Sequence, residues 1–180
     1  MVLSHNRLQL RRFTTMLRDH IEDDRAFLLR LRGAWGNEAF SADVSYLQQL
    51  IRRVRDCRGP ILECGSGLTT VLAERTGATV WSLEQDETWA RHLERALVDN
   101  RIERVRLLQR PLRSFDQFLW YDVETLDLPR HFPLVLCDGP AVFQDRGETF
   151  YRSWRYGVQP ILSGRAITFG EMLVHQDLAG

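Results

Sequence analysis

The stretch PILECGSGLTT, residues 60–70, gives the clearest indication of the fold. The apolar run from Ile61 to Cys64 predicts a buried strand, and Gly65 and Gly67 predict a tight turn that leads into a helix. Such a turn lets the backbone approach a ligand closely, while the start of the helix offers unpaired N–H donors. The stretch therefore predicts a ligand-binding loop between a strand and a helix.

On the carboxyl-terminal side of this stretch, short apolar runs alternate with amphipathic ones. The apolar runs predict strands at residues 61–64, 79–83, 105–108, 133–137 and 165–169. The intervening patterns predict helices near residues 68–76, 86–100, 113–121 and 145–158. Alternating strands and helices are typical of a Rossmann-like α/β fold, whose parallel sheet has right-handed crossovers. We therefore expect a parallel sheet of about five strands with flanking helices.

On the amino-terminal side, residues 1–58 are predicted to form a helical segment that packs on a core of residues 59–180, as one domain overall. Apolar residues in the first half of this segment recur at spacings of three and four, which indicates one helix face, and a break in the helix is expected near Asp23-Asp24. Ser41 is the expected N-cap of a second helix that ends near Cys57.

Composition narrows the class of protein. Hydrophobic residues make up 44% of the 180 residues, which is typical of a folded chain. Lys and Arg total 24, as do Asp and Glu, so bulk charge gives no reason to expect nucleic acid or an anionic membrane as a partner. No apolar run reaches the roughly 18 residues of a membrane span. The three cysteines include no CxxC pair, and we expect them to be small residues of the core. We therefore expect a cytoplasmic protein.

In an open parallel sheet, ligands bind beyond the carboxyl ends of the strands, so the residues after each strand are informative. Glu84 ends the second predicted strand, 21 residues after Glu63, which is close to the spacing of about 20 at which an acid accepts hydrogen bonds from ribose hydroxyls. Thr70 stands where a dinucleotide-binding fingerprint has its third glycine, which disfavours a pyrophosphate ligand.

Taken together, residues 61–97 resemble the first two motifs of class I S-adenosylmethionine-dependent methyltransferases, and the resemblance extends over residues 41–170. It implies that the turn after the first strand wraps the methionine portion of the cofactor and that Glu84 holds the ribose, with Asp86 nearby. The cofactor-binding residues that it implies are Glu63, Gly65, Ser66, Gly67, Glu84, Gln85, Gln109, Leu112 and Asp138. Among these, Gln109 would hydrogen-bond the adenine ring and Leu112 would cover it.

The turn Asp138-Gly139-Pro140 resembles the turn after the fourth strand in one branch of the family, with Arg146 following at a similar distance. Asp138 would face the methyl group and the acceptor, and it is the predicted catalytic carboxylate. The family's metal-dependent branch has an Asp-Asn pair after the fifth strand, where this chain has residues 168–171, TFGE, so no metal is expected.

The family's sheet continues into a sixth strand and an antiparallel seventh. The eleven residues after Phe169 are too few for both, so these two strands are expected to be missing. An open sheet edge invites pairing, and a homodimer that covers this edge is therefore a reasonable expectation.

The sequence thus predicts an S-adenosylmethionine-dependent methyltransferase that acts on a small-molecule acceptor. The alternatives are a non-catalytic or truncated domain that serves as an interaction module, aminopropyl transfer on the same fold, and, less favoured, an NAD-binding oxidoreductase. The two glycines, Glu84 and Asp138 could also serve only a turn or a strand end. His92, His131 and His175 show no metal-binding spacing and are expected to be surface or packing residues.

Overall fold

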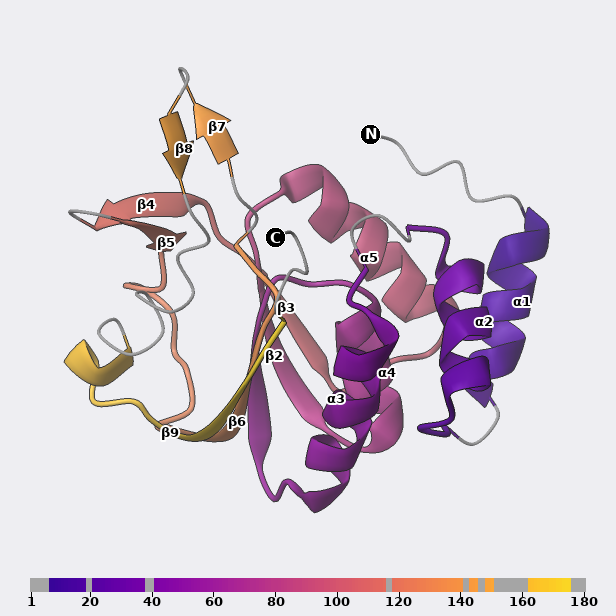
Figure 1. Cartoon of the computed structure of the whole chain (residues 1–180). Helices are drawn as coiled ribbons and strands as arrows, with labels where there is room; N and C mark the ends of the chain where they lie inside the picture. Colours follow the sequence, from indigo (N-terminus) through magenta and orange to yellow (C-terminus); the bar gives the residue numbers. More distant parts are fainter. Residues whose placement is uncertain are drawn as a thin grey trace.

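The computed structural model describes residues 7–18, 21–37, 41–115, 118–140, 143–145, 148–150 and 162–175. At its centre is a parallel sheet with the strand order β3-β2-β1-β6-β9 (Figure 1). These strands are β1 (Pro60–Cys64), β2 (Thr79–Glu84), β3 (Val105–Gln109), β6 (His131–Cys137) and β9 (Thr168–Val174). The order matches the first five positions of the doubly wound Rossmann order, which confirms the predicted α/β class with a five-stranded parallel sheet.

The two helices between the first three strands lie where the sequence predicted them. Helix α4 (Leu68–Thr76) connects β1 to β2, and α5 (Glu87–Asp99) connects β2 to β3. Asp86 caps α5, because its carboxylate accepts a hydrogen bond from the backbone N–H of Trp89 at 2.8 Å. Gly77, in a positive-φ conformation, ends α4.

Three further helices precede the sheet: α1 (Arg7–Arg18), α2 (Arg25–Trp35) and α3 (Val44–Asp56). The expected break lies between α1 and α2, and Asp24 caps α2 by accepting from the N–H of Phe27 at 2.8 Å. The sequence predicted Ser41 as the N-cap of α3, and this prediction is wrong. Asp43 takes that position, because its carboxylate accepts from the N–H of Tyr46 at 2.9 Å.

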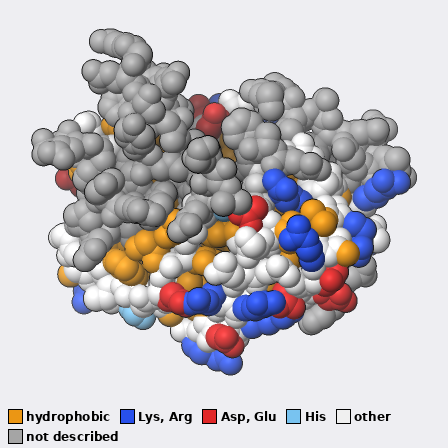
Figure 2. Space-filling view, in the orientation of Figure 1, with side chains coloured by type: hydrophobic (Ala, Val, Ile, Leu, Met, Phe, Trp, Pro, Cys, Tyr) orange, Lys and Arg blue, Asp and Glu red, His pale blue; other side chains and the backbone are white. Residues whose placement is uncertain are grey.

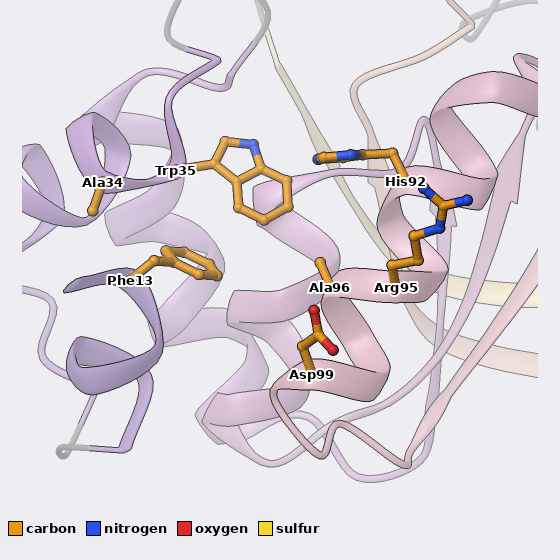
Figure 3. Close-up of a pocket in the computed structure, with 7 residues that line it drawn as sticks. All are labelled: Phe13, Ala34, Trp35, His92, Arg95, Ala96 and Asp99. Carbon is orange, nitrogen blue, oxygen red and sulfur yellow. The ribbon is translucent and has the colours of Figure 1, made fainter. Parts of the chain in front are cut away.

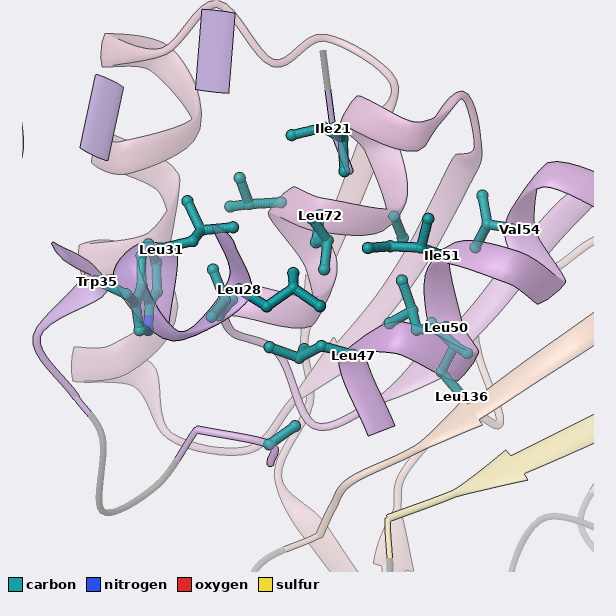
Figure 4. Packing of buried hydrophobic residues seen from close by; sticks show 14 of the residues in the cluster. Ile21, Leu28, Leu31, Trp35, Leu47, Leu50, Ile51, Val54, Leu72 and Leu136 are labelled. Atoms are coloured by element: carbon teal, nitrogen blue, oxygen red, sulfur yellow. The ribbon is translucent and has the colours of Figure 1, made fainter. Parts of the chain in front are cut away.

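The central strands β1, β2 and β6 are largely buried on both faces, as is typical of a parallel sheet. In β6, Leu134 and Leu136 belong to one apolar cluster, whereas the alternate residues Val135 and Cys137 belong to another. Helices α3, α4 and α5 cover the first face, and α1 and α2 lie outside them (Figure 1). Figure 4 shows Leu72 of α4 among apolar side chains of α2 and α3, such as Leu28 and Ile51.

The second face is covered differently from the prediction. The helix expected near residues 113–121 is instead an antiparallel hairpin of β4 (Leu112–Phe115) and β5 (Phe118–Tyr121). Trp120 and Tyr121 are fully buried and pack in the second cluster. Aromatic residues fit a pleated, half-buried surface well, which is why this segment pairs as strands.

A second hairpin corrects the prediction of a helix near residues 145–158. Strands β7 (Phe143–Asp145) and β8 (Glu148–Phe150) pair in antiparallel fashion, and residues 151–158 lie outside the described part of the chain, as does Arg146. The expected shortage of strands is therefore corrected as well. The described residues form nine strands, of which four belong to the two hairpins and five to the main sheet.

None of the helices in the described part of the chain is long and apolar enough to cross a membrane. Figure 2 shows basic and acidic side chains mixed over the described part of one face, beside a band of exposed apolar side chains.

Candidate functional site

The turn after β1 packs against the turn after β6. Gly65 has a φ of +90° and donates its backbone N–H to the carbonyl of Leu83 at 3.0 Å. A Cβ atom on Gly65 would lie 2.6 Å from the backbone nitrogen of Gly139, and one on Gly139 would lie 2.8 Å from the Cα of Gly65. Glycine is therefore required at both positions, because any side chain would separate the two loops.

Glu63 is buried beneath this turn. Its Oε2 accepts hydrogen bonds from the hydroxyls of Thr70 at 2.5 Å and Ser82 at 2.6 Å, and Thr70 accepts in turn from the N–H of Gly67 at 2.9 Å. Burial raises the pKa of Glu63 to about 7, although these hydroxyls oppose the change. Thr70, which stands in place of the third glycine of a dinucleotide-binding loop, thus ties the start of α4 to β1.

Glu84 lies at the end of β2, beside the same turn, and only 4% of it is exposed. Its Oε2 accepts from the N–H of Ser66 at 3.1 Å and from the Ser66 hydroxyl at 2.6 Å, and its Oε1 accepts from the N–H of Asp86 at 2.9 Å. Burial raises the pKa of Glu84 against these hydrogen bonds. A carboxylate has about four acceptor positions, so it can accept at least one more hydrogen bond.

The residues expected near adenosine lie at the adjacent ends of β2 and β3. Gln109 is the register partner of Glu84, and its amide donates to the carbonyl of Gln85 at 3.2 Å. Leu112 is half-buried at the start of the first hairpin. Asp86 caps α5, so its carboxylate already has a structural role.

Asp138 follows β6 and is tied to the turn after β1, because its backbone N–H donates to the carbonyl of Cys64 at 2.9 Å. Its carboxylate oxygen Oδ1 lies 2.8 Å from Nδ1 of His175, and Nε2 of His175 lies 3.2 Å from Oδ2 of Asp43. Sequence reasoning did not include His175 or Asp43 in the site. The two residues are far apart in the chain, and because the last strand was predicted at residues 165–169, no signal in the sequence placed His175 at the end of a strand.

Tyr121 was also missed. Its side chain is fully buried, and in the described part of the chain its hydroxyl has no hydrogen-bond partner. A Cβ atom on Gly139 would lie 2.7 Å from this hydroxyl, so Tyr121 reaches the point where the two turns meet. Burial raises its pKa well above 10, with the nearby acids adding to the effect, so the phenol stays neutral.

Two further buried oxygens near this edge lack partners among the described residues, namely Oε1 of Glu63 and Oε1 of Gln85. Buried polar atoms are nearly always hydrogen-bonded, and leaving one without a partner costs about 1–3 kcal/mol. A polar ligand at this edge could satisfy such atoms.

The charge of the site is distinctive. Glu63, Glu84 and Asp138 gather at one sheet edge, and none of them forms an ion pair with Lys or Arg within the residues that the structure describes. Carboxyl groups that lack a Lys or Arg partner in a shielded place attract a cation and repel a phosphate. No group of three or more His, Cys, Asp or Glu side chains is placed to hold a metal ion in the described segments.

A separate pocket of about 230 Å³ lies between the amino-terminal helices and α5 (Figure 3). Its lining residues are Phe13, Ala34, Trp35, His92, Arg95, Ala96 and Asp99. Trp35 meets Trp89 edge-on at 6.1 Å, and Trp89 donates from Nε1 to the carbonyl of Ser66 at 2.8 Å. The wall of the pocket is thus connected to the turn after β1, although no predicted site residue lines it.

No family model and no curated protein match this sequence. Among solved structures, the chain is similar to one from the "Trypanosoma brucei PRMT1 enzyme-prozyme heterotetrameric complex with AdoHcy", with 17% identity, a TM-score of 0.38, and coverage of 51% of this chain and 27% of that chain. It is also similar to the "delta-N METTL16 MTase domain", with 16% identity, a TM-score of 0.43, and coverage of 78% of this chain and 65% of that one.

The chain thus spans less than two thirds of the length of both solved chains. Because both TM-scores are below 0.5, neither similarity supports an argument about function. The fold assignment rests on the observed strand order and on the packing of helices on the sheet.

Proposed function

We propose that this chain is an S-adenosylmethionine-dependent methyltransferase of the class I type, in the branch with an Asp-Gly-Pro turn, and that it acts on a small-molecule acceptor. One observation carries the proposal. The glycine turn, Glu84 and Asp138 meet at the carboxyl edge of the sheet, where Glu63, Glu84 and Asp138 have no Lys or Arg partner among the described residues. A sulfonium cation suits such a place better than a phosphate does.

The residues present fit this cofactor. The close approach of Gly65 and Gly139 leaves backbone rather than side chains at the centre of the site. Glu84 retains acceptor capacity for a ribose hydroxyl, and Tyr121 has a hydroxyl without a partner among the described residues. When bound, the cofactor supplies an electrophilic methyl group. The chain then has to align the acceptor with that methyl and exclude water.

Two other functions are less well supported. A nicotinamide dinucleotide would bring a pyrophosphate toward Glu63 and Glu84, and Thr70 occupies the position that its fingerprint reserves for glycine. A non-catalytic interaction module would keep the fold without binding the cofactor, so a binding measurement separates it from the proposed enzyme.

Glu84→Gln is expected to weaken the binding of S-adenosylmethionine at least tenfold, which is about 1.4 kcal/mol. In the wild-type chain, the carboxylate of Glu84 accepts hydrogen bonds from the backbone N–H groups of Ser66 and Asp86. The NH₂ group of a glutamine would face one of these donors without forming a hydrogen bond, and the substitution would also remove the negative charge from the ribose site. Isothermal titration of both chains with S-adenosylmethionine, S-adenosylhomocysteine and NADH measures the effect.

The matched control is Glu87→Gln. Glu87 lies in the first turn of α5, three residues after Glu84, but it is exposed and pairs with Arg91. Binding should be unchanged in this variant. A folded wild-type chain that binds neither sulfur compound would instead support the interaction module, and selective binding of NADH would support the oxidoreductase.

We also propose that the protein forms a homodimer through β9. This strand pairs with β6 on one side and has no strand partner on the other within the described part of the chain. A two-fold axis would pair two copies of this edge in antiparallel fashion. Size-exclusion chromatography with light scattering should then give a dimer, and a clean monomer at micromolar concentration would contradict this proposal. The three free cysteines suit a reducing compartment such as the cytoplasm.

A further inference from the structure

Three residues from separate elements meet beside the proposed acceptor position. They are Asp43, the N-cap of α3, His175, which follows β9, and Asp138, which follows β6. His175 lies between the two carboxylates, with Nδ1 at 2.8 Å from Asp138 and Nε2 at 3.2 Å from Asp43, and only 11% of its side chain is exposed. The three side chains therefore form one hydrogen-bonded chain across this edge of the sheet.

The two oxygens of Asp138 differ in their surroundings. Oδ1 faces His175, whereas Oδ2 has no hydrogen-bond partner in the described segments, and 20% of the side chain remains exposed. The backbone of Asp138 is fixed to the turn after β1 through the carbonyl of Cys64. His175 therefore holds one oxygen while the other stays accessible beside the proposed cofactor.

His175 can change its protonation state without moving. Its Nε2 lies 3.2 Å from the backbone N–H of Asp43 and also 3.2 Å from Oδ2 of the same residue. A neutral ring accepts from the N–H, and a charged ring donates to the carboxylate. Because both contacts are already in place, gain or loss of a proton needs no rearrangement.

The groups that face His175 are consistent with this role. Burial raises the pKa of Asp43, but hydrogen bonds from Ser45 and Tyr46 and the charge of His175 outweigh it, so the net change is downward and Asp43 stays ionised. The Tyr46 ring meets His175 edge-on at 5.1 Å, and its hydroxyl donates to the carbonyl of Leu173. Burial raises the pKa of Tyr46 well above 10, with Asp138 adding to it, so the phenol stays neutral.

We infer that Asp43, His175 and Asp138 form a proton-accepting relay and that the methyl acceptor is consequently a protic nucleophile, a hydroxyl or an amine. This inference rests on the proposed methyltransferase function. As the acceptor oxygen or nitrogen bonds to the methyl carbon, the carbon–sulfur bond breaks, and its electron pair leaves with sulfur as a neutral thioether. The proton of the acceptor goes to Asp138 and from there to solvent. Asp138 touches the acceptor, while His175 and Asp43 are positioning residues that orient Asp138, and a neutral His175 leaves Asp138 the stronger base.

Two variants test the relay. Asp43→Asn removes the charge but keeps a side chain that caps helices equally well, so α3 should be preserved. His175→Gln removes the titrating ring. The matched control is His131→Gln, because His131 is exposed at the other end of β6, where it contacts Thr168. Transfer of a radiolabelled methyl group from S-adenosylmethionine is measured with a phenol, a primary amine and a thiolate as acceptor probes.

The wild-type chain should methylate the phenol or the amine. In both relay variants kcat should fall at least tenfold while KM for S-adenosylmethionine stays unchanged. In Asp43→Asn the rise of kcat with pH should also move to lower pH, because the charged ring loses its partner, and this shift is not expected from a merely structural role. His131→Gln should follow the wild-type profile.

Several outcomes would overturn the relay. These are relay variants as fast as wild type, transfer to the thiolate alone, or a chain that binds S-adenosylmethionine but methylates neither protic probe. If His175→Gln does not fold, Asp43→Asn decides the question. Failure of the wild-type chain to bind S-adenosylmethionine in the titration above would overturn the proposed function instead, so the two failures are distinguishable.

Discussion

Gly65→Ala is expected to lower the free energy of unfolding by about 4 kcal/mol. An alanine at a φ of +90° costs about 1–2 kcal/mol, because the side chain crowds the backbone in this conformation. The added Cβ would also lie 2.6 Å from the nitrogen and 2.8 Å from the Cα of Gly139, and forcing such contacts apart costs about 1–3 kcal/mol. Urea unfolding monitored by circular dichroism measures the loss.

Two other glycines separate these contributions. Gly77 also has a positive φ, at +123°, but no heavy atom lies within 4 Å of its Cβ position, so Gly77→Ala should show the conformational cost alone. Gly164 has open space and no positive φ, so Gly164→Ala should change stability by less than about 0.5 kcal/mol. If Gly65→Ala costs no more than Gly77→Ala, the two turns do not approach each other as closely as described.

Glu63→Gln should change the pH dependence of the free energy of unfolding. Between pH 4.5 and pH 8, the difference in this free energy between the variant and wild type should change by about 3 kcal/mol. The pKa of Glu63 rises from an ordinary 4.5 to about 7 on folding, so the folded protein holds a proton that the unfolded chain releases. Stability from this group is fully present below pH 4.5 and is lost as pH rises through about 7. The glutamine cannot ionise, so the variant should gain stability relative to wild type toward high pH.

Urea unfolding of both chains at several pH values tests this expectation. Glutamine retains an oxygen that can accept from Thr70 and Ser82, so the two chains should have similar stability at low pH. Parallel stability curves would mean that Glu63 titrates normally and that its burial is relieved in solution.

The parts of the fold that the sequence predicted correctly are those with local signals. The apolar runs of β1, β2, β3 and β6 and the amphipathic patterns of α4 and α5 each lie within one continuous stretch. The last strand was expected too early, because Ala166 takes a positive φ in a turn that delays the start of β9 until Thr168.

The errors arose where tertiary contacts overrode local pattern. Residues 112–121 contain apolar residues at spacings that also suit a helix, but burial of Trp120 and Tyr121 against the sheet selects a hairpin. Ser41 and Asp43 are both residue types that commonly cap helices. Asp43 is the N-cap of α3 in the structure, and its carboxylate also contacts His175. No local pattern could reveal that contact, because it joins residues that are 132 positions apart in the chain.

The candidate site shows the same division. The neighbouring positions of the glycine turn, Glu84 and Asp138 follow from one rule, that parallel strands end at the same edge. The buried hydroxyl of Tyr121 and the position of His175 depend on how a hairpin and the last strand close over that edge. Sequence reasoning could not place either of them.

The strand order also determines the order in which the strands can pair while the chain is being synthesised. Strands β3, β2 and β1 come from one continuous part of the chain, residues 60–109, so they can pair as soon as that part leaves the ribosome. The other neighbour of β1 is β6, which emerges only after residue 130, and such distant pairing forms slowly. A nascent chain therefore completes the glycine turn and Glu84 while Asp138 and His175 are still to come, and the cofactor half of the site matures before the half that faces the acceptor.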